Sequence, residues 1–406
     1  MHLPAARASP VTAGQAASLA ARIDALGGLR ELVALPGDHD LASAQWDAIL
    51  APLRRLQRTL RARLAAALTA RGAAVADRLG TVELEVGAAF GAFDTFADVL
   101  TQRAAPRLGR ELAGCDALAD DALRRPDPRL AALAPPLVYC DRGLGAAILR
   151  QGVHAGGEVI CPIPLIQIPY ARLVDKLTLT SILHEVGHQA LAALGIGDEL
   201  ARAVGELATG HTAVDLARWA PEIGADLWSF LCAGPAHAYA AVELFALPHA
   251  VALARGRGPH PPPALRVELA LAWCQATWPR GPWAALAGRW RARFDALPGA
   301  AATLAAVRRL APPLARATLS ARFATLDHQP LTRLFDLAAL APARLATLGG
   351  AAFAAARPCV QLAALRVAAT ETPSAAVARR ATDWLSSLRS RRCDRPVSPG
   401  GFRCLI

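Results

Sequence analysis

The sequence predicts an α+β fold that is mostly α-helical, with a small β-sheet in the middle of the chain. Apolar residues recur every three or four positions over residues 42–79, which is the spacing of an amphipathic helix. The chain beyond Gly299 is rich in alanine and leucine and is again helical in pattern. The strand candidates are a short one, Leu137–Cys140, and a longer one, Glu158–Tyr170.

The helical pattern begins at the N-terminus with two helices, over residues 42–79 and 82–103, that form a hairpin or small bundle. Four prolines between residues 126 and 136 end it. Further helices are predicted over 178–194, closed by Gly195, and near 200–219 and 222–247. A loop rich in glycine and proline at 255–263 then precedes another helix.

The longer strand candidate, Glu158–Tyr170, contains Pro162, Pro164 and Pro169. Each proline lacks the N–H group that a ladder hydrogen bond needs, so a central strand is not expected here. Pro162 and Pro164 are two residues apart and therefore disable the same side of the strand. We predict an edge strand with its other side open.

These changes of pattern divide the chain into four segments. A helical N-terminal segment (1–135) precedes a central domain (136–298) that holds both strand candidates and most candidate site residues. A helical C-terminal segment (299–390) and a loose tail (391–406) follow.

Composition excludes several classes of protein. No uncharged apolar stretch reaches about 18 residues, and no basic region followed by an apolar run opens the chain. We therefore expect neither a membrane span nor a secretory signal. The eight cysteines are scattered and form no CxxC pair. They are typical of free thiols in a reducing compartment, which predicts a soluble, cytoplasmic protein.

The net charge of +11 raises the question of nucleic-acid binding. Lys176 is the only lysine among the 44 basic residues, and the arginines are spread along the chain. Their densest group, at positions 54, 55, 58, 61 and 63, lies on the predicted 42–79 helix, whose other face is apolar. A solvated helix face explains this group better than a phosphate-binding stripe, so a nucleic-acid partner is not expected.

The chemically informative segment contains His184, Glu185 and His188. Two histidines four residues apart on a helix project from one face and can converge on one ion. Glu185 lies beside such an ion, where a carboxylate can take a proton from water; this is the HExxH arrangement of zinc hydrolases. The plain alternative is a helix whose two histidines only pack or face solvent.

A zinc ion with three protein ligands needs one more donor. Glu222 stands out because Asp226 follows one helical turn later, where it can accept the free N–H of a ligating histidine. Glu206 and His211 are alternatives without such a companion. Glu222 can also be read as an ordinary carboxylate at a helix N-terminus, directly after Pro221.

The third element joins His260 to Arg266 through Pro261, Pro262 and Pro263. The prolines hold the chain extended after His260, and a helix can open at Pro263, with Arg266 in its first turn. A cation there opposes the helix dipole, so an anionic partner is expected. A surface loop with a solvated histidine and arginine is the alternative.

Taken together, HExxH (184–188), ExxAD (222–226) and HPPxxxR (260–266) occur in the order seen in gluzincin metallopeptidases. They resemble most the family of the CAAX prenyl endopeptidases and bacterial heat-shock membrane proteases. The resemblance covers roughly residues 137–275, and the soluble ImmA/IrrE-like proteases are a second comparison. Those membrane proteases have transmembrane helices, which this sequence lacks, so membrane substrates are not implied.

The resemblance implies a zincin-like catalytic core and a role for each matched residue. His184, His188 and Glu222 bind one zinc ion, Glu185 is the general base, and Asp226 supports a ligand. His260 and Arg266 contact the substrate or transition state. Apart from the resemblance, Tyr170 and Tyr239 could each donate to an oxyanion, although structural roles explain them better. The predicted function is a soluble zinc metallopeptidase acting on a peptide or protein, with the predicted edge strand holding the substrate. A non-catalytic or latent zinc-binding regulatory protein is the alternative; no oligomeric state is indicated.

Overall fold

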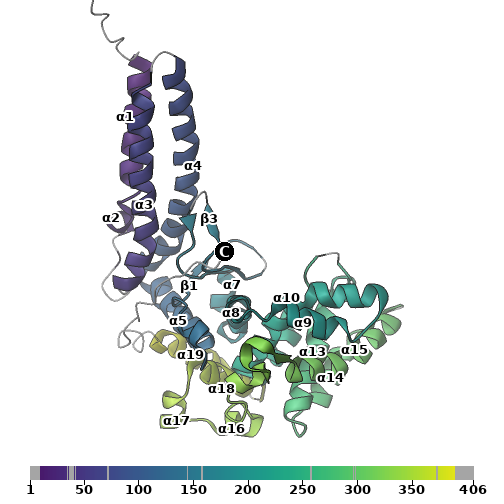
Figure 1. Cartoon of the computed structure of the whole chain (residues 1–406). Coiled ribbons are helices and arrows are strands. Elements are labelled where there is room, and N and C mark those ends of the chain that lie inside the picture. The colour runs from purple at the N-terminus through teal and green to yellow at the C-terminus, as the bar shows by residue number, and fades with distance from the viewer. Residues whose placement is uncertain are drawn as a thin grey trace, which may run out of the picture. The chain divides into compact units, whose positions relative to one another are not determined.

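The computed structural model describes residues 10–33, 35, 41, 43–70, 73–143, 145–156, 159–256, 258–295, 297, 299–371 and 374–388. Helices predominate over three small β-sheets, so the predicted class, mostly α-helical α+β, is confirmed (Figure 1). The chain forms two compact units, residues 1–112 with 149–165 and residues 113–148 with 166–406. The predicted boundaries after residues 135 and 298 fall inside the second unit, and the predicted tail 391–406 lies outside the described residues.

The first unit consists of long helices and one short hairpin of strands. In α3 the apolar side of the helix is buried, including Trp46, Ile49 and Leu53, whereas its five clustered arginines are exposed as predicted. The strands β3 and β4 pair antiparallel, with His154 opposite Ile160. The elements are α1 (Pro10–Ala25), α2 (Leu29–Val33), α3 (Ser43–Leu68), α4 (Ala73–Thr101), the 3-10 turn η2 (Gln102–Ala104), β3 (His154–Gly156) and β4 (Val159–Ile160). α5 (Pro106–Leu123) begins in this unit and ends in the second.

The second unit is a helical assembly in which α10 contacts α8, α9, α11, α13 and α18. Up to α11 its elements are α6 (Pro128–Ala131), α7 (Tyr170–Val174), η3 (Lys176–Thr178), α8 (Thr180–Leu194), α9 (Gly197–Gly205), α10 (Gly210–Ala233) and α11 (Pro235–Leu244). Later come α12 (His249–Ala252), α13 (Pro263–Thr277), α14 (Trp283–Ala292), α15 (Ala300–Ser320), β6 (Arg322–Phe323), η4 (Ala324–Leu326), β7 (Gln329–Pro330), η5 (Leu331–Leu334), α16 (Pro342–Thr347), α17 (Gly350–Ala355), α18 (Pro358–Glu371) and α19 (Ala375–Ser387).

The strand prediction for Glu158–Tyr170 is wrong. This stretch forms two strands in different sheets, β4 and β5 (Leu165–Ile168). β5 is the central strand of a three-stranded sheet whose outer strands are β1 (Leu137–Cys140) and β2 (Ala147–Leu149), so both of its edges are paired. Pro162, Pro164 and Pro169 all lie outside the strands, where a missing N–H costs no ladder bond.

α8 ends where the sequence predicts, because Gly195 adopts the left-handed conformation (φ 67°) that suits glycine at a helix C-terminus. α10, in contrast, runs without interruption through Pro221. Glu222 therefore lies in the middle of a helix rather than at an N-terminus, and its reading as a helix-dipole carboxylate is wrong. Burial of almost every α10 residue from Trp219 to Ala233 outweighs the single backbone hydrogen bond that Pro221 cannot make.

The contact between α8 and α10 depends on a small residue within the HExxH segment. A Cβ atom at Gly187 would lie 2.9 Å from Ala225 Cα and 2.9 Å from Trp228 Cβ. Likewise, a Cβ at Gly224 would lie 2.6 Å from Leu191 Cδ1. The two helices thus touch backbone to backbone at Gly187, which brings the side chains on either side of the contact close together.

Two further observations bear on the compositional predictions. Within the described residues, no helix combines the length and the apolar character needed to cross a membrane. The six cysteines in this part of the chain are free thiols, as predicted, at positions 115, 140, 161, 232, 274 and 359.

Substituting Gly187 by alanine should lower the free energy of unfolding by about 1–3 kcal/mol, because a methyl group cannot enter this contact without separating the helices. Urea unfolding of both variants measures the change. Gly288 in α14 provides the control: a Cβ there meets nothing within 4 Å, so Gly288→Ala should stabilise by about 0.5–1 kcal/mol. Equal stability of Gly187→Ala and wild type would contradict the close helix contact.

Candidate metal centre

Two imidazoles project from one face of α8. His184 and His188 are four residues apart, which places them one above the other on a helix. Their ring centroids are 4.9 Å apart and the rings are nearly perpendicular. Only 12% of the His184 side chain and 20% of the His188 side chain are exposed to solvent. The pair is therefore largely buried but open on one side.

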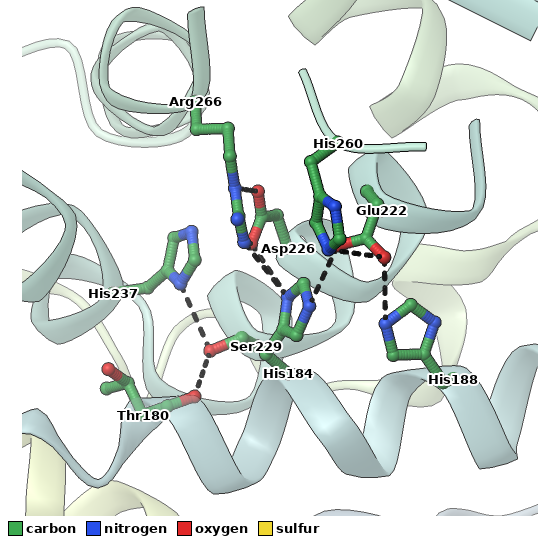
Figure 2. Close-up of polar contacts among 9 residues, drawn as sticks. All are labelled: Thr180, His184, His188, Glu222, Asp226, Ser229, His237, His260 and Arg266. Carbon is green, nitrogen blue, oxygen red and sulfur yellow. Dashed lines mark hydrogen bonds and ion pairs between the residues drawn. The ribbon is translucent and has the colours of Figure 1, made fainter. Parts of the chain in front are cut away.

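Glu222 of α10 supplies a carboxylate to both imidazoles (Figure 2). Its Oε2 lies 3.2 Å from His184 Nε2, and its Oε1 lies 3.5 Å from His188 Nε2. The ligand atoms of the three residues all lie within 4.8 Å of one another. In the described part of the chain, these three residues form the group of histidine and acidic side chains that could hold a metal ion.

The chemistry of this group fits a divalent metal ion. Glu222 Oε2 is buried and makes no well-aligned hydrogen bond within the described structure, although His184 Nε2 lies 3.2 Å away. A buried carboxylate in this position calls for a positive charge beside it, which a bound cation or a protonated His184 supplies. Two imidazoles and one carboxylate are also a donor set that zinc adopts in hydrolases.

Asp226 and Arg266 hold His184 from its other side. His184 Nδ1 is 2.8 Å from Asp226 Oδ1, so its Nδ1–H donates to the carboxylate while Nε2 faces Glu222. Arg266, in the first turn of α13, donates to both Asp226 oxygens from Nε and Nη2, each at 2.7 Å. Asp226 is thus the anionic partner expected for Arg266. The resemblance implies a substrate contact for Arg266, but its side chain is only 15% exposed and its guanidinium is engaged with Asp226.

The charges of these groups determine which ring carries a proton. Burial opposes a charged His184, but the charge of Asp226, the hydrogen bond to Asp226 and the nearby Glu222 carboxylate outweigh it and raise the pKa of His184 to about 9. Burial and the nearby His184 charge lower the pKa of His188 to about 4. Burial would raise the pKa of Asp226, yet Arg266 and His184 hold it well below its usual range. His188 therefore presents a lone pair at neutral pH, whereas His184 must first lose a proton.

Glu185 follows His184 on α8 and is 6% exposed. Burial, reinforced by the negative charges of Glu222 and Asp226, raises the pKa of Glu185 to about 7, against the opposing charges of His184 and Arg266. A carboxylate with this pKa can both accept and release a proton near neutral pH.

His260 lies in the loop before α13, next to the Glu222 carboxylate. Its Nε2 is 3.5 Å from Glu222 Oε1, and 64% of its side chain is exposed. Pro261 and Pro262 are buried and lead into α13, which begins at Pro263, the position at which the sequence allows a helix to open. His260 is thus held beside the three-residue group and faces solvent.

The alternatives raised by the sequence lie elsewhere. Glu206 and His211 are exposed and do not belong to the group around Glu222. Tyr170 is 56% exposed at the start of α7. Tyr239 is buried in α11 and packs against Trp283, with ring centroids 6.2 Å apart.

Sequence reasoning missed a chain of polar contacts beside His184, formed by Ser229, His237 and the Thr180 carbonyl (Figure 2). Ser229 Oγ donates to the backbone carbonyl of Thr180 at 3.0 Å, and His237 Nδ1 lies 3.1 Å from the same Oγ. Thr180 is four residues before His184, so its carbonyl is the α-helical acceptor for the His184 N–H. Burial lowers the pKa of His237 to about 4, which keeps it neutral. One signal was available: Ser229 is seven residues after Glu222 and so shares its helix face.

Comparison with known proteins gave no match: no family model, no curated protein and no solved structure is significantly similar to this chain.

Metal binding should depend on Glu222 far more than on Glu185. Glu222→Ala removes one of three ligand side chains and should lose most of its metal, whereas Glu185→Gln should retain one ion per chain. Asp226→Asn should weaken binding about 10–100-fold, as changes behind a ligand usually do. Elemental analysis after dialysis, followed by competition with a chromophoric chelator, measures both effects. Full metal content in Glu222→Ala would remove that residue from the ligand set.

Metal affinity should also rise with pH. The pKa of His184 is about 9 in the metal-free protein, so a proton must leave its Nε2 before a metal can bind there. Between pH 6 and 8 the dissociation constant should therefore fall about tenfold per pH unit, and the dependence should level off above pH 9. Asp226→Asn removes a carboxylate that raises this pKa, so its curve should level off at lower pH. Chelator competition at several pH values tests this; a dissociation constant independent of pH contradicts it.

Proposed function

We propose that this protein is a zinc-dependent metallopeptidase whose metal is held by His184, His188 and Glu222. The observation that carries the proposal is the convergence of both α8 imidazoles on the Glu222 carboxylate, with Asp226 bound to the remaining nitrogen of His184. A ligating histidine whose second nitrogen donates to a carboxylate is a recurrent arrangement in zinc enzymes. The order of the HExxH, ExxAD and HPPxxxR elements, which resembles that of gluzincins, supports the same reading.

Zinc in such a site supplies Lewis acidity, which polarises a peptide carbonyl and makes water more acidic. Glu185 then accepts the proton of the attacking water and passes it to the nitrogen of the leaving amine. Its raised pKa, about 7, suits both halves of this transfer, because neither protonation state is strongly favoured at neutral pH. Asp226 and Arg266 keep His184 in the orientation that leaves its Nε2 free for the metal.

In this proposal His260 assists the reaction from the open side of the site. Its exposed imidazole, 3.5 Å from Glu222 by Nε2, can donate to a carbonyl oxygen that gains negative charge in the transition state. Arg266 takes a different role from the one the resemblance implies: it holds Asp226, and through Asp226 it holds His184.

The substrate surface is not the one that the sequence predicts. Both edges of β5 are paired, so this strand cannot accept an extended peptide as a further strand. The proposal therefore rests on the metal group and its neighbours alone, with a peptide or protein as the substrate class.

A structural or regulatory metal site is the second candidate, and one observation favours it. His260 Nε2 approaches Glu222 Oε1 as closely as His188 Nε2 does, at 3.5 Å in both cases. If His260 became a fourth protein ligand, no position would remain for water, and the site would be closed as structural zinc sites are.

Turnover of a fluorogenic peptide library by the zinc-loaded protein tests the proposal. Glu185→Gln should keep its zinc and lose almost all activity, because the base is gone but the ligands remain. His260→Ala should keep its zinc and lose about 10²–10³-fold in kcat with little change in KM, since it acts on charge that forms only in the transition state.

Loss of zinc from His260→Ala would instead support the structural site with four ligands. Activity that persists in Glu185→Gln, or resists zinc removal by 1,10-phenanthroline, would contradict the metallopeptidase proposal itself.

A further inference from the structure

The loop that carries His260 follows one face of α10. Asp215, Arg218, Glu222 and Asp226 recur at intervals of three, four and four residues, which places them in one stripe along the helix. Each one contacts a later part of the chain, in the same order along both segments. The contacts join Asp215 to Arg255, Arg218 to the Gly256 carbonyl, Glu222 to His260 and Asp226 to Arg266.

The two ends of this loop are anchored by different means. On the C-terminal side, Pro261 and Pro262 are buried, and α13 is tied to α10 through the largely buried Arg266–Asp226 pair. On the N-terminal side the anchor is electrostatic. Arg255 Nη2 lies 2.5 Å from Asp215 Oδ2, with 53% of the arginine side chain and 17% of the aspartate side chain exposed.

Arg218 and Trp219 complete the N-terminal anchor. Arg218 Nη2 lies 2.5 Å from Asp215 Oδ1 and 3.5 Å from the Gly256 carbonyl oxygen. The guanidinium carbons of Arg218 and Arg255 each lie 5.9 Å from the centre of the buried Trp219 ring, within range of a cation–π contact. Asp215 thus holds two arginines, one on α10 and one on the loop.

We infer that Asp215 and Arg255 are positioning residues that hold His260 over Glu222. His260 is 64% exposed, and its one polar contact in the described structure is the 3.5 Å approach to Glu222, so its own contacts fix it weakly. Glu222 lies seven positions after Asp215 on α10, about 10 Å along the helix, and His260 lies five positions after Arg255 in the chain. The Asp215–Arg255 ion pair therefore determines the position of the His260 imidazole along α10. The effect on turnover rests on the proposed function; the effect on His260 position does not.

Arg255→Gln tests the inference in the zinc-loaded full chain, with two readouts. The ring signal of His260 in ¹H–¹³C NMR, assigned by its loss in His260→Ala, should move toward that of a histidine in a short unstructured peptide. With the best library peptide, kcat should fall about two- to fivefold at unchanged zinc content, which is what a half-exposed ion pair can contribute. Arg255→Lys, which keeps the charge, should stay closer to wild type in both readouts.

Two controls separate positioning from a general loss of stability. Arg61→Gln removes an equally exposed arginine, 53%, from its ion pair with Asp24 and should change neither readout. In the His260→Ala background, Arg255→Gln should cause no further loss of turnover, because the side chain through which it acts is absent.

An unchanged His260 signal in Arg255→Gln overturns the inference, and so does an equal loss of turnover in both backgrounds. If the wild-type protein cleaves no peptide, the proposed function fails, while the NMR comparison still decides whether the anchor positions His260.

Discussion

The backbone contact between α8 and α10 at Gly187 is the constraint on which the metal group depends. Side chains at a helix crossing usually keep the axes about 8–10 Å apart, and a glycine allows the closest approach. A Cβ at this position would lie 2.9 Å from Ala225 Cα. His184 and His188 flank the contact on one helix, and Glu222 and Asp226 flank it on the other. The carboxylates can reach the imidazoles because nothing larger than hydrogen separates the helices.

The buried charges around this contact alternate in sign. Arg266 pairs with Asp226, Asp226 with His184, and His184 with Glu222. With the pKa of His184 raised to about 9, Arg266 and His184 carry the positive charges that face Asp226 and Glu222 at neutral pH, and the neighbouring Glu185, with a pKa of about 7, is only partly ionised. Buried ions are tolerated when they are paired in this way. A metal ion that binds at His184 Nε2 must therefore displace a proton from it.

The parts of the site that follow from local spacing could be predicted from the sequence. His184, His188 and the Glu222/Asp226 pair all rest on the i, i+4 geometry of a helix, and the end of α8 at Gly195 follows from one residue's backbone preference. Tertiary pairing could not be predicted in the same way. The order of strands in a sheet is set by segments distant in sequence, so the prolines around β5 suggested an edge although they lie outside the strand. Pro221 suggested the start of a helix, but α10 continues through it, because the burial of the helix in the tertiary structure overrides the local preference of proline.

The polar stripe of α10 also limits which insertions and deletions this helix can tolerate. Asp215, Arg218, Glu222, Asp226 and Ser229 share one face of a single helix, and each contacts a residue outside that helix. Each residue of an α-helix advances the face by about 100°. One residue inserted or deleted within this helix would therefore turn every contact on one side of the change away from its partner at once. A single substitution in this stripe removes the contacts of one residue, whereas an insertion or deletion removes the contacts of several residues at once. The spacing between these five residues is therefore as much a part of the site as their chemistry.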